Sequence, residues 1–352
     1  MPKESHVVEW IVLGIGIAFF ALMGALVLVS GIKDVGRALA STSWPRVPAE
    51  VAQSEVTGEL QRDPDGSRNM MYSARLVFAY EVAGQPYTTG QIRFGEALGS
   101  GDPSEPEMQR LRYPEGARVS VAYQPDNPAV AVARPGLRPG ALVPPLAGVG
   151  LLLGAAFIFL AGRFLVSSAP VLPILLRLFV LVFILIGLGL AVPGFMNIRH
   201  AGASKHWPTT EGKVVFQQGD RIVSRWRDSE GRLQQAASHA TAIVYSYEVD
   251  GITHFSNTRR WGQLAAAGKG RATDIATRYP VGAAVEVRYN SRDPDLAVLE
   301  PGLTSEVWWL PLAGLGFLLF GLAVWIWAIP ALTGGGAAAA TLPARARKRR
   351  QP

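Results

Sequence analysis

The side chains that most often bind metals or carry out catalysis are few in this sequence. It has no cysteine, which excludes disulfides, thiolate nucleophiles and cysteine-bound metals. No two of its five histidines stand three or four residues apart, the spacing that places two metal ligands on one face of a helix. The histidines are His6, His200, His206, His239 and His254. We therefore expect no bound metal and no cofactor.

Two glutamates, Glu81 and Glu248, occupy matching positions in similar segments, and a general acid or base is one role to consider for them. Each segment alternates apolar and polar residues, as a half-buried strand does, and the glutamate falls on the polar face. This pattern predicts exposed carboxylates, paired across a hairpin with Arg93 or Arg260. No serine or histidine constellation accompanies them, so we assign no catalytic residue and expect no enzyme.

Two short segments resemble anion-binding sites incompletely. Arg112-Tyr113-Pro114 and its copy Arg278-Tyr279-Pro280 could hold an anion, but a tyrosine under a sheet, a proline that stops a helix and a solvated arginine explain the same residues. We favour that structural interpretation. Gly268-Lys269-Gly270 lacks the Gly-x-x-x-x-Gly-Lys-Ser/Thr spacing of a phosphate loop, and we expect a flexible or helix-interrupting segment there.

Long apolar runs indicate a membrane protein. Hydrophobic residues make up 49% of the 352 residues and charged residues only 17%. Four uncharged runs are long enough to cross a hydrocarbon core about 30 Å thick. The predicted transmembrane helices are 10–32, 141–162, 178–198 and 307–329. Because their centres carry no ionisable side chain, a pump, an ion-coupled transporter or a charged pore is not expected.

Two details of these spans carry separate predictions. The first span is too long for the apolar region of a signal peptide, so we expect it to be retained. Gly150 and Gly154 form a Gly-x-x-x-Gly pair, which allows two helix backbones to approach closely. We expect this pair to act in packing within the group of four helices.

The charge distribution sets the predicted orientation. The loop 163–177, bordered by Arg163 and Arg177, and the basic tail 334–352 should lie in the cytoplasm, together with the N-terminus 1–9. The tail supplies five of the charges behind the net +7, through Arg345, Arg347, Lys348, Arg349 and Arg350. We expect this disordered tail to bind anionic inner-leaflet lipid and not nucleic acid, since it lacks interleaved aromatic residues. The protein is thus predicted to be a multi-pass protein of the plasma (inner) membrane.

Two polar segments, 44–138 and 205–303, are then predicted to lie outside the cytoplasm. They carry the same motifs in the same order, which indicates a duplicated unit. The fold class is therefore α+β, with four transmembrane helices and two homologous β-rich domains. We expect each domain to be a small sandwich or barrel of about five to seven strands with one short helix. In the first, the predicted elements are strands 76–82, 87–94, 118–123 and 129–133 and a helix 105–112.

The repeated motifs are short, but their order is specific. They include Trp-Pro at 44 and 207, a Tyr-x-Val-x-Gly hairpin ending at 84 and 251, Tyr-Pro-x-Gly at 113 and 279, and Pro-Gly-Leu at 135 and 301. His254 matches Tyr87, which predicts a half-buried strand residue. The second domain has Leu299-Glu300-Pro301-Gly302 where the first has Ala133-Arg134-Pro135-Gly136.

Together these motifs resemble a family of domains of unknown function, DUF3592, and the second domain fits the family pattern better than the first. The resemblance covers both polar domains, roughly half the chain. It implies membrane residence and a β-rich fold, and it implies no catalytic residues.

The expected function is that of a non-enzymatic membrane protein that displays two tandem β-rich domains to bind or scaffold an envelope protein or polymer. One alternative is a membrane-anchored hydrolase with an unrecognised site. A second is a passive conduit or an accessory subunit of a transporter.

Overall fold

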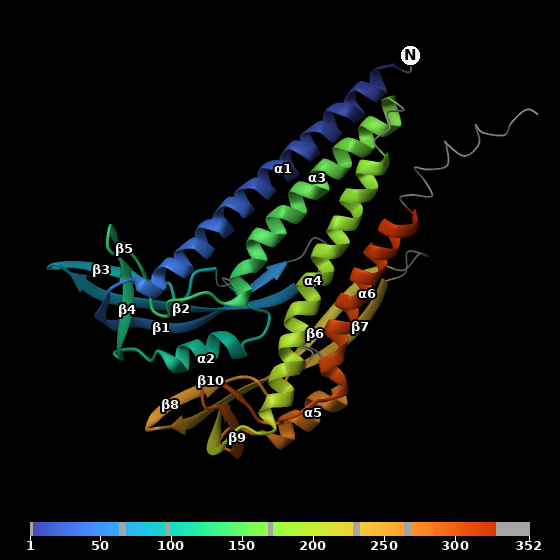
Figure 1. The fold of residues 1–352 in the computed structure, drawn as a ribbon. Helices are drawn as coiled ribbons and strands as arrows, with labels where there is room; N and C mark the ends of the chain where they lie inside the picture. Colours follow the sequence, from blue (N-terminus) through green and yellow to red (C-terminus); the bar gives the residue numbers. More distant parts are fainter. Residues whose placement is uncertain are drawn as a thin grey trace, which may run out of the picture. The chain divides into compact units, whose positions relative to one another are not determined.

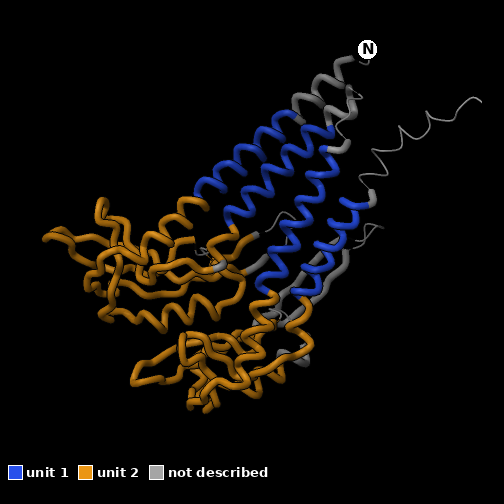
Figure 2. Tube along the Cα trace, viewed as in Figure 1, with its two compact units in different colours: residues 1–30, 144–193, 310–352 blue, residues 31–143, 194–309 orange. Residues whose placement is uncertain are grey.

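The computed structural model describes residues 3–62, 68–95, 99–167, 172–227, 233–263 and 269–328. The tail 334–352 lies outside the described residues. The chain forms two compact units, coloured separately in Figure 2. One contains Met1–Ser30, Pro144–Pro193 and Leu310–Pro352, and the other contains Gly31–Val143 and Gly194–Trp309.

The second unit holds two antiparallel sheets with the same topology, one in each polar segment (Figure 1). We call residues 44–138 domain 1 and residues 205–303 domain 2. Domain 1 contains β1 (Arg46–Arg62), β2 (Arg68–Val82), β3 (Gln85–Thr89), α2 (Ser104–Arg112), β4 (Arg118–Gln124) and β5 (Asn127–Val132), in sheet order β3-β2-β1-β4-β5. Domain 2 contains β6 (Thr209–Arg227), β7 (Leu233–Val249), β8 (Ile252–Ser256), α5 (Lys269–Arg278), β9 (Ala284–Asn290) and β10 (Asp293–Val298), in sheet order β10-β9-β6-β7-β8.

Local geometry repeats between the domains as closely as the topology does. The β2–β3 and β7–β8 hairpins turn on Ala83-Gly84 and Asp250-Gly251, and all four residues have positive φ. Two such residues in a row make the two-residue turn whose twist matches that of the flanking strands. β1 and β6 also carry an irregularity at the same point, after Val51 and after Val214.

Each sheet curls until its two edge strands approach each other. In domain 1 the segment after β3 bonds the segment after β5, through Ala133 N to Gln91 O at 3.1 Å and Arg134 N to Ile92 O at 2.8 Å. In domain 2 the Glu300 N–H bonds Arg259 O at 2.8 Å. Each domain therefore contains one curved five-stranded sheet whose edges approach each other, and not the two packed sheets of the predicted sandwich alternative.

The core of each domain lies between the curled sheet and the end of its helix. In domain 1, Val51, Phe78 and Val121 are fully buried, and the Tyr113 ring meets Phe78 edge-on at 5.2 Å. In domain 2, Val214, Tyr245 and Val287 occupy the matching positions and are also fully buried. The helices end at Arg112 and Arg278, so the tyrosine that follows each one packs under the sheet, as predicted.

Several predicted boundaries need correction. β3 ends at Thr89 and does not reach Phe94, and β5 covers Asn127–Val132. The sequence interpretation also missed β1 and the first half of β2. β4 pairs only with Arg46–Glu50 of β1, so the rest of β1 and β2 forms a two-stranded ribbon. Such a ribbon has little core to bury, and its sequence therefore lacks a clear apolar alternation.

Four helices are long and apolar enough to cross a membrane, over Gly14–Ser43, Gly140–Ala161, Ile174–Ser204 and Ser305–Ile326. The α-helices themselves are α1 (Lys3–Ala40), α3 (Val143–Ser167), α4 (Leu172–Ser204) and α6 (Trp309–Ala323). Short helical turns, Ser41–Ser43, Pro139–Leu142, Ser305–Trp308 and Val324–Ala328, adjoin their ends. α3 and α4 occupy most of the segment 163–177 that was predicted as a loop.

Glycines allow close packing within the helical unit, but they are not the predicted ones. A Cβ on Gly148 of α3 would lie 2.5 Å from Leu28 N of α1. A Cβ on Gly314 of α6 would lie 2.5 Å from Ala191 N of α4, the matching contact in the second helix pair. A Cβ on Gly150 or Gly154 would meet nothing within 4 Å, so the packing role predicted for that pair is wrong.

We predict that Gly148→Ala destabilises the α1–α3 pair by about 1–3 kcal/mol, because the added methyl group must push against the backbone of α1. Gly150→Ala is the matched control. It should be neutral or stabilising by up to about 1 kcal/mol, since alanine favours helix and the site is open. Thermal unfolding in detergent measures both. Equal effects of the two substitutions would contradict the packing described.

Candidate functional site

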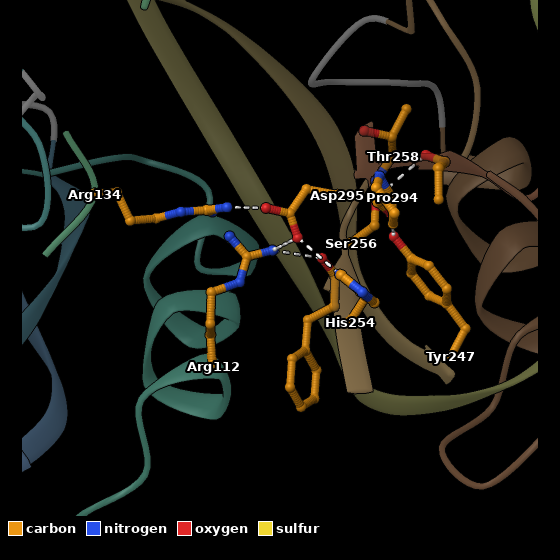
Figure 3. A network of polar contacts seen from close by, with 10 residues as sticks. Arg112, Arg134, Tyr247, His254, Ser256, Thr258, Pro294 and Asp295 are labelled. Carbon is orange, nitrogen blue, oxygen red and sulfur yellow. Dashed lines mark hydrogen bonds and ion pairs between the residues drawn. The ribbon is translucent and has the colours of Figure 1, made fainter. Parts of the chain in front are cut away.

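An ionic cluster joins domain 1 to domain 2 around the carboxylate of Asp295 (Figure 3). Arg134 donates a short hydrogen bond to one carboxylate oxygen. Arg112 Nη2 lies 3.3 Å from the other oxygen, and His254 Nδ1 lies 3.0 Å from that same atom. Both arginines belong to domain 1, whereas Asp295 and His254 belong to domain 2.

The surrounding elements fix each of these side chains. Arg112 is the last residue of α2, and Arg134 follows β5, where its N–H bonds Ile92 O. His254 lies on β8 and stacks on Tyr247 with ring centroids 5.7 Å apart. The Tyr247 hydroxyl donates to the carbonyl of Pro294, which holds the backbone beside Asp295. Contacts within domain 2 thus position the carboxylate that the two arginines of domain 1 bind.

Further hydrogen bonds connect the two domains beside the ionic cluster. Arg112 Nη2 donates to Phe255 O at 2.9 Å. Asn257 Nδ2 donates to Ser104 Oγ at 3.1 Å and to Glu105 Oε2 at 3.3 Å, both at the start of α2. One face of α2 therefore lies against β8 and the segment that follows it.

The cluster is partly shielded from water. Asp295 is 18% exposed, Arg112 19% and His254 16%. Burial by itself would raise the pKa of the Asp295 carboxyl, but Arg112, Arg134 and His254 outweigh burial and hold that pKa well below its usual range. Asp295 is therefore ionised at neutral pH, and its charge is matched by the guanidinium groups of domain 1.

Domain 2 has a second ionic cluster, which is internal. Glu300 accepts hydrogen bonds from Arg259 at 3.1 Å, from Tyr279 at 2.9 Å and, at shorter range, from Arg260. Arg278 lies 3.8 Å from the same carboxylate but is 66% exposed. Burial alone would raise the pKa of Glu300, but Arg259, Arg260 and Tyr279 together lower it.

The two clusters occupy matching places in the repeated fold, with the charges rearranged. Arg112 matches Arg278, and Arg134 matches Glu300. Asp295 matches Ala129. Domain 1 thus has a cation where domain 2 has its internal carboxylate. The carboxylate that its arginines contact is supplied by domain 2.

The polar groups around Asp295 are paired with one another or with backbone carbonyls. The hydroxyls near the histidine and the aspartate are already engaged, since Ser256 Oγ donates to Ala297 O at 3.3 Å and Tyr247 donates to Pro294 O. Among the described residues, no group of three or more histidine and acidic side chains could hold a metal ion.

The residues singled out from the sequence meet different outcomes. Glu81 and Glu248 are exposed, as predicted. The predicted pairing of Arg260 with Glu248 is wrong, because Arg260 contacts Glu300 and Glu306. The expectation of a solvated arginine is confirmed for Arg278 and wrong for Arg112, which the contact with domain 2 covers.

The predictions for the histidines and for the glycine-rich segment also have different outcomes. His254 is half-buried, as predicted, His206 is exposed, and the His200 ring packs against Trp261 at 4.7 Å. The side chains of His6 and His239 lie outside the described residues. Lys269 and Gly270 begin α5, so they do not interrupt a helix, and Gly268 lies outside the described residues.

Sequence reasoning missed Asp295, Arg134 and Asn257 as contact residues. One signal was present, namely the exchange of Glu300 for Arg134 at matching positions of the two copies. A charge reversal inside a repeated motif indicates that the counterion has moved elsewhere, and here it has moved to the other domain.

Comparison with protein families gives a match that supports the resemblance seen in the motifs. The family model described as "Domain of unknown function (DUF3592)" matches residues 47–138 and 210–304, together just over half of the chain. The two segments coincide with domains 1 and 2, as a tandem duplication of one domain requires. A comparison with curated proteins finds no match.

We predict that Arg112→Ala lowers the free energy of unfolding by roughly 1.5–3 kcal/mol, because it removes charge-assisted bonds to Asp295 and Phe255. Arg278→Ala is the matched control at the end of α5. It should change stability by no more than about 0.5 kcal/mol, since its side chain is largely solvated. Denaturant unfolding followed by tryptophan fluorescence tests both, and a larger loss for Arg278→Ala would refute the assignment.

Acidification should separate the two domains. Because the pKa of Asp295 is lowered in the docked state, the separated state binds more protons once the pH falls below about 4, the ordinary aspartate pKa. The stabilisation is complete above that pH and is lost as the pH falls towards the docked pKa. Spin labels at Asp126→Cys and Asp274→Cys report the interdomain distance. We expect it to broaden below about pH 4.

Asp295→Asn is the control for this titration. It should show the broadened distance at neutral pH and little further change on acidification. An unchanged distance in the parent protein at low pH, with both sheets still folded by circular dichroism, would contradict the proposed role of the carboxylate.

Proposed function

The chain belongs to the DUF3592 family, and we propose that it is a non-enzymatic integral membrane protein whose two β-domains form one binding or scaffolding body outside the cytoplasm. The observation that carries this proposal is the ionic cluster at Asp295. A partly buried contact of this kind favours one fixed arrangement of the domains, and a fixed arrangement offers a partner a larger continuous surface than either domain alone.

The helices support the membrane half of the proposal. Four of them are long and apolar enough to span a bilayer, and each domain stands between two of them in the sequence. Arg163, Arg177 and the basic tail favour a cytoplasmic location for the helix ends that face away from the two domains in the sequence. We therefore propose four membrane passes in the plasma (inner) membrane, with anionic lipid as the partner of the tail.

The repeated geometry supports descent of both domains, with their helix pairs, from one duplicated unit. The Ser41 hydroxyl accepts a hydrogen bond from Gly136 N at 3.1 Å, and the Ser204 hydroxyl accepts one from Gly302 N at 3.2 Å. These bonds tie the end of a helix to the Pro-Gly-Leu turn in the same way in both copies. A shared ancestor accounts for such matched detail more economically than convergence does.

The site chemistry supports binding over catalysis. Asp295 is neutralised by two arginines, and the tyrosine and serine hydroxyls beside it donate to backbone carbonyls. A general base must reach a substrate proton, and a nucleophile must have a base that is free to take its proton. The paired carboxylate and hydroxyls at Asp295 favour neither role. The partner we propose is an envelope protein or polymer that contacts both domains.

Because the chain has no cysteine, one experiment can test both the side of the membrane on which the two domains lie and the partner that they bind. Asp126→Cys and Arg292→Cys place single thiols on the exposed β4–β5 and β9–β10 turns, at matching positions. A membrane-impermeant maleimide carrying a photo-crosslinker should label both in intact cells and capture the same partner from each. Ala338→Cys in the tail should be labelled only after permeabilisation.

The Asp295→Asn background is the functional control, and we expect it to lose joint capture while keeping the labelling pattern. Labelling of only one turn in intact cells would contradict the proposed topology. Efficient labelling without any reproducible crosslink from either turn would contradict the scaffolding role.

A further inference from the structure

The contact between the two domains uses a different surface from each. Domain 1 contributes what we call its donor face, formed by α2 and Arg134. Domain 2 contributes its acceptor face, formed by β8, Asn257 and Asp295. A contact between unlike surfaces of repeated bodies leaves one unused surface on each and can continue from molecule to molecule. Here the unused surfaces are the acceptor face of domain 1 and the donor face of domain 2.

The acceptor face of domain 1 keeps its shape but lacks the docking groups. Tyr80 and Tyr87 stack with ring centroids 5.9 Å apart, as Tyr247 and His254 do at 5.7 Å. The Tyr80 hydroxyl donates to Pro128 O, as Tyr247 does to Pro294 O. At the positions of Asp295, His254 and Asn257, however, domain 1 has Ala129, Tyr87 and Gly90.

The donor face of domain 2 keeps one arginine but reverses the second charge. Arg278 is 66% exposed and matches Arg112. Glu300 stands where domain 1 has Arg134, and its carboxylate is held by Arg259 and Tyr279. An aspartate that approached this face as Asp295 approaches domain 1 would meet the Glu300 carboxylate at the place of Arg134. The neighbouring Arg259 and Arg260 are already paired with that carboxylate, so the guanidinium that receives Asp295 in domain 1 has no free counterpart here.

We infer that Ala129 and Glu300 act as specificity residues that end the array at two domains and keep a second copy of the chain from docking through these faces. Each residue blocks one of the two unused surfaces. The acceptor face lacks a carboxylate to offer, and the donor face has no free guanidinium at the place of Arg134 to receive one. The interaction is therefore confined within a chain, where domain 1 can receive only domain 2.

Two grafts turn this inference into a gain-of-function experiment. The acceptor graft, Tyr87→His with Ala129→Asp, gives domain 1 the histidine and the aspartate of the docking groups of domain 2. The donor graft, Arg259→Ile with Glu300→Arg, gives domain 2 the residues that domain 1 has at those positions. Each graft alone has only one new complementary face, whereas a mixture of the two has both.

The full-length grafts are purified separately in detergent, and the protein mass is measured by light scattering before and after mixing. We expect association in the mixture at least about tenfold tighter than for either graft alone, because only the mixture pairs the new carboxylate of the acceptor graft with the new guanidinium of the donor graft. Within each chain the original contact should persist, since Asp295 is tethered at high effective concentration. A disulfide between Ser104→Cys and Asn257→Cys verifies that persistence.

Several results would overturn the inference. One is a mixture whose mass distribution equals that of the separate grafts when both are folded. Another is a parent protein that already associates and loses this association on Arg278→Ala. If the donor graft fails to fold, Glu300→Gln replaces it. This variant removes the carboxylate charge that occupies Arg259 and Arg260 and keeps hydrogen bonding, so no association of folded Glu300→Gln with the acceptor graft would also overturn the inference.

Discussion

The charge of Asp295 is the constraint on which the arrangement of the two β-domains depends. Its carboxylate is four-fifths shielded from water, a position that would favour protonation if the group stood alone. Arg112 and Arg134 of domain 1 prevent this, and in return they gain a counterion that their own domain does not provide at the matching position. Removing either side would leave a partly buried charge without its partner, which costs more than the intact pair contributes.

Charge rearrangement between the copies explains why a duplicated unit does not produce two interchangeable domains. Domain 2 carries its carboxylate, Glu300, beside its own arginines, whereas domain 1 carries Arg134 at that place. The shared backbone tolerates the exchange, because the bond from residue 134 or 300 to the segment after the opposite edge strand uses only backbone atoms. The fold thus stays the same in both copies, while the partner of each cluster differs.

Much of the fold could be predicted from the sequence, because it depends on local patterns. The hairpin turns at Gly84 and Gly251, the helix that ends at Arg112 and the four apolar runs all leave periodic or positional signals. The distal half of the β1–β2 ribbon could not be predicted, since two strands whose further pairing is a single bridge, from Tyr72 to Ser100, bury few side chains. The contacts of Asp295 with Arg112 and Arg134 were also out of reach, because residues from separate domains meet there and each domain was interpreted alone. Comparing the copies for charge reversals at Arg134 and Glu300 would have indicated the cluster.

A double-mutant cycle on Arg134 and Asp295 tests the central claim most directly. Arg134→Ala, Asp295→Ala and the double variant are compared with the parent by denaturant unfolding in detergent. If the pair joins the domains, the second substitution costs little once the first is present, and the coupling free energy exceeds about 1 kcal/mol. Losses that add to within about 0.5 kcal/mol would show that the two side chains act independently and would contradict the account.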